Sequence, residues 1–216
     1  MFFLPNGTHI VAKLVEYMRS QMRNHGFKEV ITPQLFKNDL WKQSGHWDHY
    51  KEDMFSVKGG TAEEEEQFSL KPMNCPGHCL IFKSQERSFR ELPIRYADFS
   101  PLHRNESSGA LTGLTRVRRF HQDDGHIFCQ LGQVKTEIAS SLRLVDSVYR
   151  VFGLTYQPVL STRPTEGFIG DPKVWDEAES QLKTALTESL PQLEGKITIN
   201  EGDGAFYGCL LYTSPS

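Results

Sequence analysis

Apolar residues recur along three stretches of the chain with the period expected of amphipathic helices. The first stretch runs from Ile10 to Met22, with Asn6 or Thr8 available as its N-cap and Gly26 placed to end it. A shorter helix begins at a proline, a residue tolerated in the first turn of a helix. The helices predicted after the first one span residues 76–86, 133–152 and 174–190.

Shorter apolar runs between these helices predict strands. Hairpins and helices are segregated along the chain instead of alternating regularly, which favours an antiparallel sheet with helices packed on it, an α+β fold. Neither a G-x-G-x-x-G motif after a strand nor a G-x-x-x-x-G-K-[ST] loop occurs, so the usual nucleotide-binding folds are unsupported. The predicted strands span residues 27–31, 53–57, 67–71, 154–160 and 196–199, with residues 92–106 extended and a hairpin within residues 103–128.

The stretch of residues 103–128 places charged, aromatic and amide side chains on what reads as two strands of a hairpin. Alternate side chains of a strand share a face, so Arg104 and Glu106 point the same way. Cations suit phosphate, an aromatic ring suits a flat base, and a carboxylate suits an ammonium group. The alternative is a solvated ribbon held by salt bridges, which is the usual outcome for a charged run. On the second strand the shared face would carry Arg116, Arg118, Phe120, Gln122, Asp124 and His126.

A second segment, KPMNCPGHC at residues 71–79, brings metal-binding residue types close together. Cys75 and His78 have C-x-x-H spacing, and Cys79 follows directly, which points to zinc. Zinc needs three or four protein ligands, and His126 and Cys129 are the distant candidates. The alternative is a buried thiol and a histidine that serve only the turn and the helix.

The composition restricts the class of protein. A chain of 216 residues is long enough for one sizeable domain, and its net charge of −3 argues against a generically basic nucleic-acid-binding protein. Four irregularly spaced cysteines favour reduced thiols over a disulfide framework. No apolar run approaches the roughly 20 residues that span a bilayer. We therefore expect no membrane association and a cytoplasmic location.

The segments KPMNCPGHC and HRNESSGALTGLTRVRRFHQDDGHIFC resemble the catalytic core of the threonyl-tRNA synthetases, which are class II aminoacyl-tRNA synthetases. Four further segments resemble the same family: FFLPNGTHI, FKEVITPQLF, LSTRP and GDGAFYG. The sequence is most similar to the eukaryotic cytosolic forms of the family. The resemblance implies an antiparallel sheet flanked by helices. It assigns residues 1–208 to a partial catalytic domain and treats residues 209–216 as an artefactual tail.

The resemblance also implies an ATP site on the hairpin, with Mg²⁺ entering together with ATP. Arg104 would bind the α-phosphate and the reacting carboxylate, Glu106 the adenine, and Arg116 the distal phosphates. Phe120 would stack on the adenine. Activation joins two anions, so such a site has to supply positive charge and alignment. Taken singly, each arginine could instead form a surface ion pair, and Phe120 could simply pack in the sheet.

Zinc in this family selects threonine. The resemblance places zinc on Cys75, on His126 and on a third ligand, a histidine farther downstream, with threonine bound through its amino group and hydroxyl. A site that must bind the hydroxyl rejects valine strongly but admits serine. Gln122, Asp124 and Tyr207 match family residues beside the amino acid, with Asp124 near the hydroxyl. The product would be threonine joined to tRNA(Thr).

Motif 3, the third zinc ligand and the anticodon-binding domain of the family are not found in the sequence, so we expect the 216-residue chain to have little activity alone. Residues 10–33 match motif 1, which implies a homodimer. A truncated paralogue that acts as a binding or dimerising module is the competing hypothesis. A class II synthetase for serine or proline is disfavoured by the pairing of Cys75 with His126.

Overall fold

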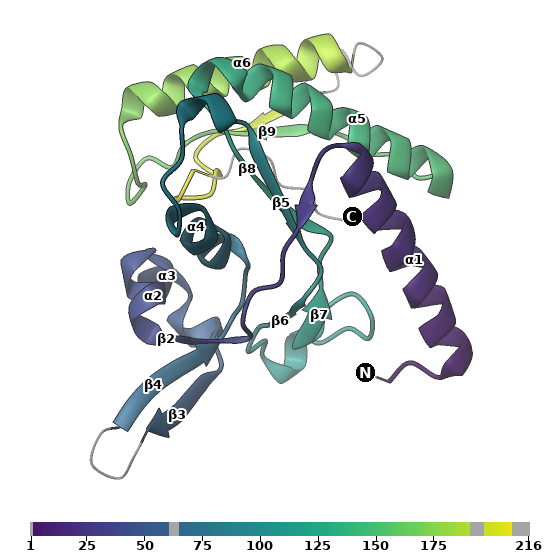
Figure 1. Cartoon of the computed structure of the whole chain (residues 1–216), viewed down its shortest axis with the longest axis vertical. Helices are drawn as coiled ribbons and strands as arrows, with labels where there is room; N and C mark the ends of the chain where they lie inside the picture. Colours follow the sequence, from purple (N-terminus) through teal and green to yellow (C-terminus); the bar gives the residue numbers. More distant parts are fainter. Residues whose placement is uncertain (1, 61–64, 191–196, 209–216) are drawn as a thin grey trace. The chain divides into compact units, whose positions relative to one another are not determined.

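The computed structural model describes residues 2–60, 65–190 and 197–208, and Figure 1 labels its helices and strands. Pro5 stands in the first turn of α1 (Pro5–Asn24), where its missing N–H removes no hydrogen bond. Gly153 ends α5 (Val134–Phe152) with a φ of 65°, a left-handed conformation that favours glycine. All four predicted helices are present, and two short ones are additional. The other helices are α2 (Asn38–Gln43), α3 (His46–Tyr50), α4 (Cys75–Lys83) and α6 (Pro172–Ser189).

The strands form small sheets, of which the described residues contain four, in the orders β1-β5-β8, β2-β4-β3, β6-β7 and β10-β9. Strand β4 pairs antiparallel with β2 and β3, and β6 with β7, whereas β1 with β5 and β9 with β10 are parallel. The α+β class is confirmed, and the pairing is mixed instead of wholly antiparallel. The strands are β1 (Lys28–Glu29), β2 (Leu35–Lys37), β3 (Ser56–Gly60), β4 (Glu65–Leu70), β5 (Ile94–Asp98), β6 (Pro101–His103), β7 (Arg119–His121), β8 (Asp124–Phe128), β9 (Val159–Ser161) and β10 (Thr198–Asn200).

The second strand of the predicted hairpin is interrupted. Strand β7 pairs with β6, with Phe120 opposite Leu102, whereas β8 belongs to the sheet with β5 and β1. Gln122 and Asp123 lie between the two strands. The prediction of one continuous polar face from residue 116 to residue 126 is therefore wrong, because the chain changes sheets in the middle of it.

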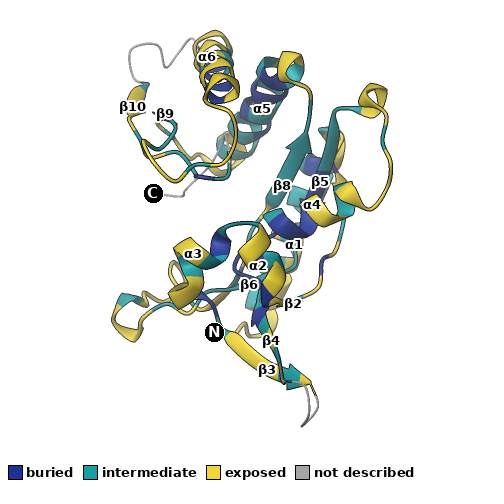
Figure 2. Ribbon diagram, turned by 90° about the vertical axis from the view of Figure 1, so that its left-hand side faces the viewer, coloured by how far each residue is buried: buried dark blue, intermediate teal, exposed yellow. Residues whose placement is uncertain are grey.

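Two compact units make up the fold: residues 1–88 with 95–126, and residues 89–94 with 127–216. In the second unit, α5 and α6 bury their apolar sides together with β9, and Figure 2 shows the buried side of each helix. In the first unit, Trp41 and Leu102 are fully buried. No helix in the described part of the chain is long and apolar enough to cross a bilayer. The residues of the second core are Val134, Ile138, Leu142, Leu160, Leu182, Ala185, Leu186 and Leu190.

The domain boundary drawn at residue 208 stays a prediction, and the supposed tail of residues 209–216 lies outside the described residues.

Candidate active site

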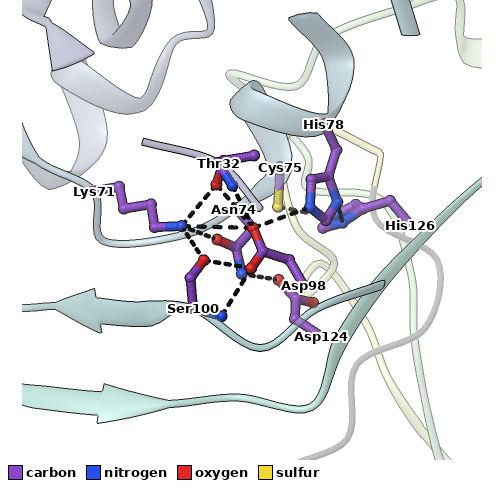
Figure 3. A network of polar contacts seen from close by, with 9 residues as sticks. All are labelled: Thr32, Lys71, Asn74, Cys75, His78, Asp98, Ser100, Asp124 and His126. Atoms are coloured by element: carbon purple, nitrogen blue, oxygen red, sulfur yellow. Dashed lines mark hydrogen bonds and ion pairs between the residues drawn. The ribbon is translucent and has the colours of Figure 1, made fainter. Parts of the chain in front are cut away.

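A fully buried lysine lies at the centre of a polar network in the first unit (Figure 3). Lys71 directly follows β4, and its side chain is 0% exposed. Its Nζ donates to Thr32 Oγ1 at 2.7 Å, to Asn74 Oδ1 at 2.8 Å and to Ser100 Oγ at 2.6 Å. An ammonium group has three hydrogens to donate, so all of its donors are satisfied. Burial lowers the pKa of Lys71, and the nearby Asp98 carboxylate opposes that shift.

The carboxylate of Asp98 lies at the end of β5 and is also fully buried. Its Oδ2 lies 3.6 Å from Lys71 Nζ and accepts hydrogen bonds from Thr32 N at 3.2 Å and Thr32 Oγ1 at 2.8 Å. Its Oδ1 accepts from Ser100 N at 2.8 Å and from Ser100 Oγ. Burial alone would raise the pKa of Asp98, but interactions with His78, Ser100 and Thr32 outweigh burial and hold the pKa well below its usual range. Asp98 is therefore a buried anion.

One arm of this network reaches Asp124, which the resemblance assigned to the threonine hydroxyl. Asn74 accepts from Lys71 through Oδ1 and donates from Nδ2 to Asp124 Oδ2 at 3.0 Å. The lysine thus determines which way the Asn74 amide points, and the amide in turn holds the Asp124 carboxylate. The structure links Asp124 to a rigid, buried anchor that the sequence analysis did not identify.

The predicted metal ligands Cys75 and His126 come together at the start of α4 and on β8. Cys75 Sγ lies 2.9 Å from His126 Nε2 (Figure 3). Ligands of one tetrahedral zinc lie about 3.5 Å apart, so a small opening would admit the metal, and the donor types fit zinc. Burial lowers the pKa of His126, which favours the neutral imidazole that binds metals. The described residues contain no group of three or more candidate ligands, so the structure supplies two donors of the expected three.

His78, the histidine of the C-x-x-H spacing, lies against His126, one of the two metal ligands that the resemblance implies. Its Nδ1 is 2.8 Å from His126 Nδ1, and the two rings meet edge to face with centroids 4.7 Å apart. Cys79, the next residue of α4, is exposed. Cys129, the other distant candidate, belongs to the second unit and packs against that unit's apolar core.

A glycine separates Asp124 and His126, the two candidate site residues of β8. A Cβ added to Gly125 would lie 2.8 Å from Phe27 Cε1 and 3.3 Å from the backbone oxygen of Tyr96. The backbone of β8 therefore approaches β5 and the Phe27 ring more closely than any side chain would allow.

The predicted ATP residues lie on and around the β6–β7 pair. The guanidinium of Arg104 is 5.1 Å from the centre of the Phe120 ring, and Arg104 Nε donates to Pro72 O at 3.4 Å. The backbone N–H of His103 also donates to Lys71 O at 3.0 Å. These contacts bring the hairpin and the cysteine-containing segment together, as the chemistry of one site requires.

Glu106 and Arg116 contact each other in this structure. Arg116 Nη2 is 2.8 Å from Glu106 Oε2, and the arginine side chain is 58% exposed. Arg118 also braces this region, because its Nε donates to Glu106 O at 2.9 Å. The surface ion pair considered as an alternative is therefore present, on the edge of the predicted ATP site.

The contacts described above do not involve two of the predicted residues, Gln122 and Tyr207. Gln122 is half-buried between β7 and β8. Tyr207 belongs to the second unit, where its ring meets that of Phe206 at 5.0 Å. The roles of Gln122 and Tyr207 beside the amino acid stay predictions. Lys71 and Asp98 were not predicted from the sequence. The available signal was Asp98 itself, a carboxylate at the end of the mostly apolar strand β5.

Comparison with known proteins gives a consistent result. The model of the tRNA synthetase class II core domain (G, H, P, S and T) matches residues 55–197. The mitochondrial threonine–tRNA ligase of Saccharomyces cerevisiae is 56% identical over 96% of this chain and 46% of its own length. The cytoplasmic threonine–tRNA ligase 1 of Homo sapiens is 56% identical over 96% of this chain and 27% of its own length.

Solved structures agree with the sequence relatives. A crystal structure described as the RNA binding domain of threonyl-tRNA synthetase from Cryptosporidium parvum superposes with a TM-score of 0.84 at 48% identity, covering 96% of this chain and 50% of that chain. A putative threonyl-tRNA synthetase from Aeropyrum pernix gives 0.82 at 32% identity, covering 94% and 45%. The chain thus spans about half or less of the length of the relatives it matches.

Proposed function

The chain belongs to the class II tRNA synthetase core-domain family, and we propose that it forms the catalytic core of a threonine–tRNA ligase. This enzyme would activate threonine with ATP and transfer it to tRNA(Thr). The observation that carries the proposal is the approach of Cys75 Sγ to His126 Nε2 at 2.9 Å. The same unit also holds Arg104 against Phe120.

The ATP half of the proposal rests on charge and stacking. Attack of a carboxylate on the α-phosphate needs a cation that contacts both groups, and half-buried Arg104 can supply it. Phe120 offers a flat apolar face for the adenine. Arg116 is exposed enough to exchange Glu106 for a distal phosphate, which would release Glu106 for the adenine. Mg²⁺ would enter with the nucleotide.

The amino-acid half of the proposal rests on zinc held by Cys75 and His126, with a histidine expected as the third ligand. Zinc bound there would supply a Lewis acid that the amino group and hydroxyl of threonine can both reach. Asp124, oriented by Asn74, would accept a hydrogen bond from that hydroxyl. Valine lacks the hydroxyl and would leave these groups unsatisfied, whereas serine retains it. Gln122 and Tyr207 would complete the amino-acid site.

We propose a cytoplasmic location for the enzyme. The human relative is named as cytoplasmic, which supports this location, but the yeast relative of equal identity is named as mitochondrial. The proposal therefore rests mainly on the similarity of the sequence to eukaryotic cytosolic forms of the family.

The function is tested on the complete natural polypeptide that carries this sequence. We expect ATP–pyrophosphate exchange with threonine and serine and little exchange with valine. Cys75→Ala should lose both bound zinc, measured by atomic absorption, and exchange activity. Cys79→Ser, which alters the exposed thiol of the same helix, should change neither. Exchange that proceeds equally well with valine, or that is unaffected by Cys75→Ala, would show that the proposed selection by zinc is wrong.

A second role, self-association, is favoured by the exposed apolar side of α1. Ile10 is 59% exposed and Leu14 is 42% exposed, one helical turn apart, and Met22 is the one buried residue of the 20-residue helix. A helix of this length gains most of its stability from packing. A second copy of the chain would cover this surface, in agreement with the homodimer implied by the motif 1 resemblance.

Replacing both Ile10 and Leu14 with glutamate should shift the chain from dimer to monomer in sedimentation velocity, because charges at an apolar interface lose their hydration. Lys13→Glu provides the control, since Lys13 is exposed on the same helix and pairs with Glu16. A monomeric unaltered chain, or a dimer that survives the double substitution, would rule out this interface.

A further inference from the structure

His78 lies between the predicted metal ligand and a buried carboxylate. It is a fully buried residue of α4. Its Nδ1 is 2.8 Å from His126 Nδ1, and its Nε2 is 3.6 Å from Asp98 Oδ2. Within the described part of the chain, His78 Nε2 has no hydrogen-bond partner at normal distance. A carboxylate, two imidazoles and a thiol therefore follow one another in a row that ends at Cys75 (Figure 3).

The proton positions along this row are constrained. A neutral imidazole carries one donor and one acceptor, so in the 2.8 Å contact between the two Nδ1 atoms one ring donates and the other accepts. His126 faces Cys75 with Nε2, and that nitrogen must be unprotonated to bind a metal. The proton of His126 then sits on Nδ1 and is donated to His78. The proton of His78 consequently sits on Nε2 and faces Asp98.

The opposite arrangement is unfavourable. If His78 donated from Nδ1, its Nε2 lone pair would face the Asp98 carboxylate in a buried site. His126 would then carry its proton on Nε2, the atom directed at Cys75, and could not bind a metal through that atom. The arrangement that satisfies Asp98 is therefore the same one that frees His126 Nε2.

We propose that His78 and Asp98 are positioning residues for zinc, which hold His126 in the tautomer and orientation that present Nε2 to the metal beside Cys75. This inference rests on the zinc site of the proposed function and adds residues that do not touch the metal. A metal-bound histidine commonly donates its second N–H to an oriented partner, and removal of that partner typically weakens metal binding 10–100-fold. Here the partner is a second histidine, oriented in turn by a carboxylate.

Asp98 is suited to this role because its own position is determined from several sides. Thr32 and Ser100 donate to its two oxygens, and Lys71 lies 3.6 Å from Oδ2. The lysine also orders Asn74 and hence Asp124. One buried ion pair thereby supports both the imidazole for the metal and the carboxylate for the substrate.

The test measures zinc binding by the complete natural polypeptide that carries this sequence, using competition with a chromophoric chelator. We expect His78→Gln and Asp98→Asn each to weaken zinc binding by roughly 10–100-fold. Cys75→Ala should lose the site, and Cys79→Ser, at the residue next to His78, should bind zinc as the unaltered chain does. Circular dichroism of each variant identifies any that fail to fold.

A second measurement needs no substitution at the positioning residues. Long-range ¹H–¹⁵N correlation spectra of the complete, unaltered polypeptide loaded with zinc report the tautomer of each histidine. We expect His126 to carry its proton on Nδ1 and His78 on Nε2. A purely structural role for His78 makes no such demand on either ring.

The possible outcomes distinguish the positioning role of His78 and Asp98 from the zinc site of the proposed function. If Cys75→Ala weakens zinc binding but His78→Gln and Asp98→Asn do not, or if His126 binds through Nδ1, the positioning role is wrong and the zinc site stands. If Cys75→Ala binds zinc as well as the unaltered chain, the zinc site is wrong and the inference falls with it. A loss in Cys79→Ser would assign the metal to the exposed thiol and overturn the inference.

Discussion

Replacing Arg104 with alanine is expected to lower the rate of threonine-dependent ATP–pyrophosphate exchange by roughly 10²–10³-fold, the usual effect of removing one group that stabilises transition-state charge. Arg104 is half-buried and lies against the Phe120 ring, and Pro72 O holds its Nε, so it is positioned before substrates bind. A positioned cation needs little reorganisation in the transition state. The measurement is initial-rate exchange in the complete natural polypeptide at saturating ATP and threonine.

The control for Arg104 is another arginine paired with a phenylalanine. Arg90 lies over the Phe89 ring at 5.7 Å on an exposed part of the second unit. Arg90→Ala should leave exchange almost unaltered. Arg104→Lys should recover only part of the lost rate, because an ammonium group cannot reproduce the planar, two-pronged contact of a guanidinium. A rate for Arg104→Ala within about tenfold of the unaltered protein would contradict the catalytic role, since it falls below that range.

Replacing Lys71 with methionine is expected to lower the free energy of unfolding by roughly 3–5 kcal/mol, the usual result of breaking a buried ion pair from one side. The substitution keeps the side-chain length but leaves Asp98 as an uncompensated buried charge. It also removes three hydrogen bonds, to Thr32, Asn74 and Ser100. The loss is large against the 5–15 kcal/mol that holds an ordinary domain together.

Urea unfolding of the 216-residue chain, followed by tryptophan fluorescence, measures this effect. Lys13→Met is the matched control, because Lys13 also forms an ion pair, with Glu16, but both side chains are more than half exposed. It should leave the free energy of unfolding nearly unaltered, because water screens an exposed ion pair. Combining Lys71→Met with Asp98→Asn should recover part of the loss, since the second change removes the orphaned charge. A loss in Lys71→Met no larger than in the control would contradict the importance of the pair.

Much of the fold followed from local pattern. In α5, the core residues Ile138 and Leu142 are spaced at the helical period. Gly153 follows the last residue of the helix, and glycine is the residue type that most easily adopts the left-handed conformation found there. The break between β7 and β8 was not predictable in this way. Side-chain parity continues through Gln122 and Asp123 as if the strand were unbroken, because alternation within one strand carries no information about which sheet it joins.

The candidate site was predictable only where residue type alone suggests chemistry. Cys75 and His126 were named as ligands through the family resemblance. The structure places Cys75 Sγ 2.9 Å from His126 Nε2, and their role as metal ligands stays a prediction. The importance of Lys71 and Asp98 could not be seen, because it depends on burial and on partners distant in the sequence. A lysine near a turn is ordinarily solvated, and only the fold reveals that this one is enclosed.

The tight approach at Gly125 also bears on attempts to change the amino-acid selectivity that we propose for this site. Asp124 and His126 sit on either side of a backbone that has no room for a Cβ, so neither residue can be shifted independently of the strand. A mutant library that diversifies residue 125 would therefore consist mostly of members in which the Phe27 ring or the backbone of β5 has to move. Altered selectivity is better sought by substituting residues around the proposed site while residues 124–126 of β8 are left unchanged.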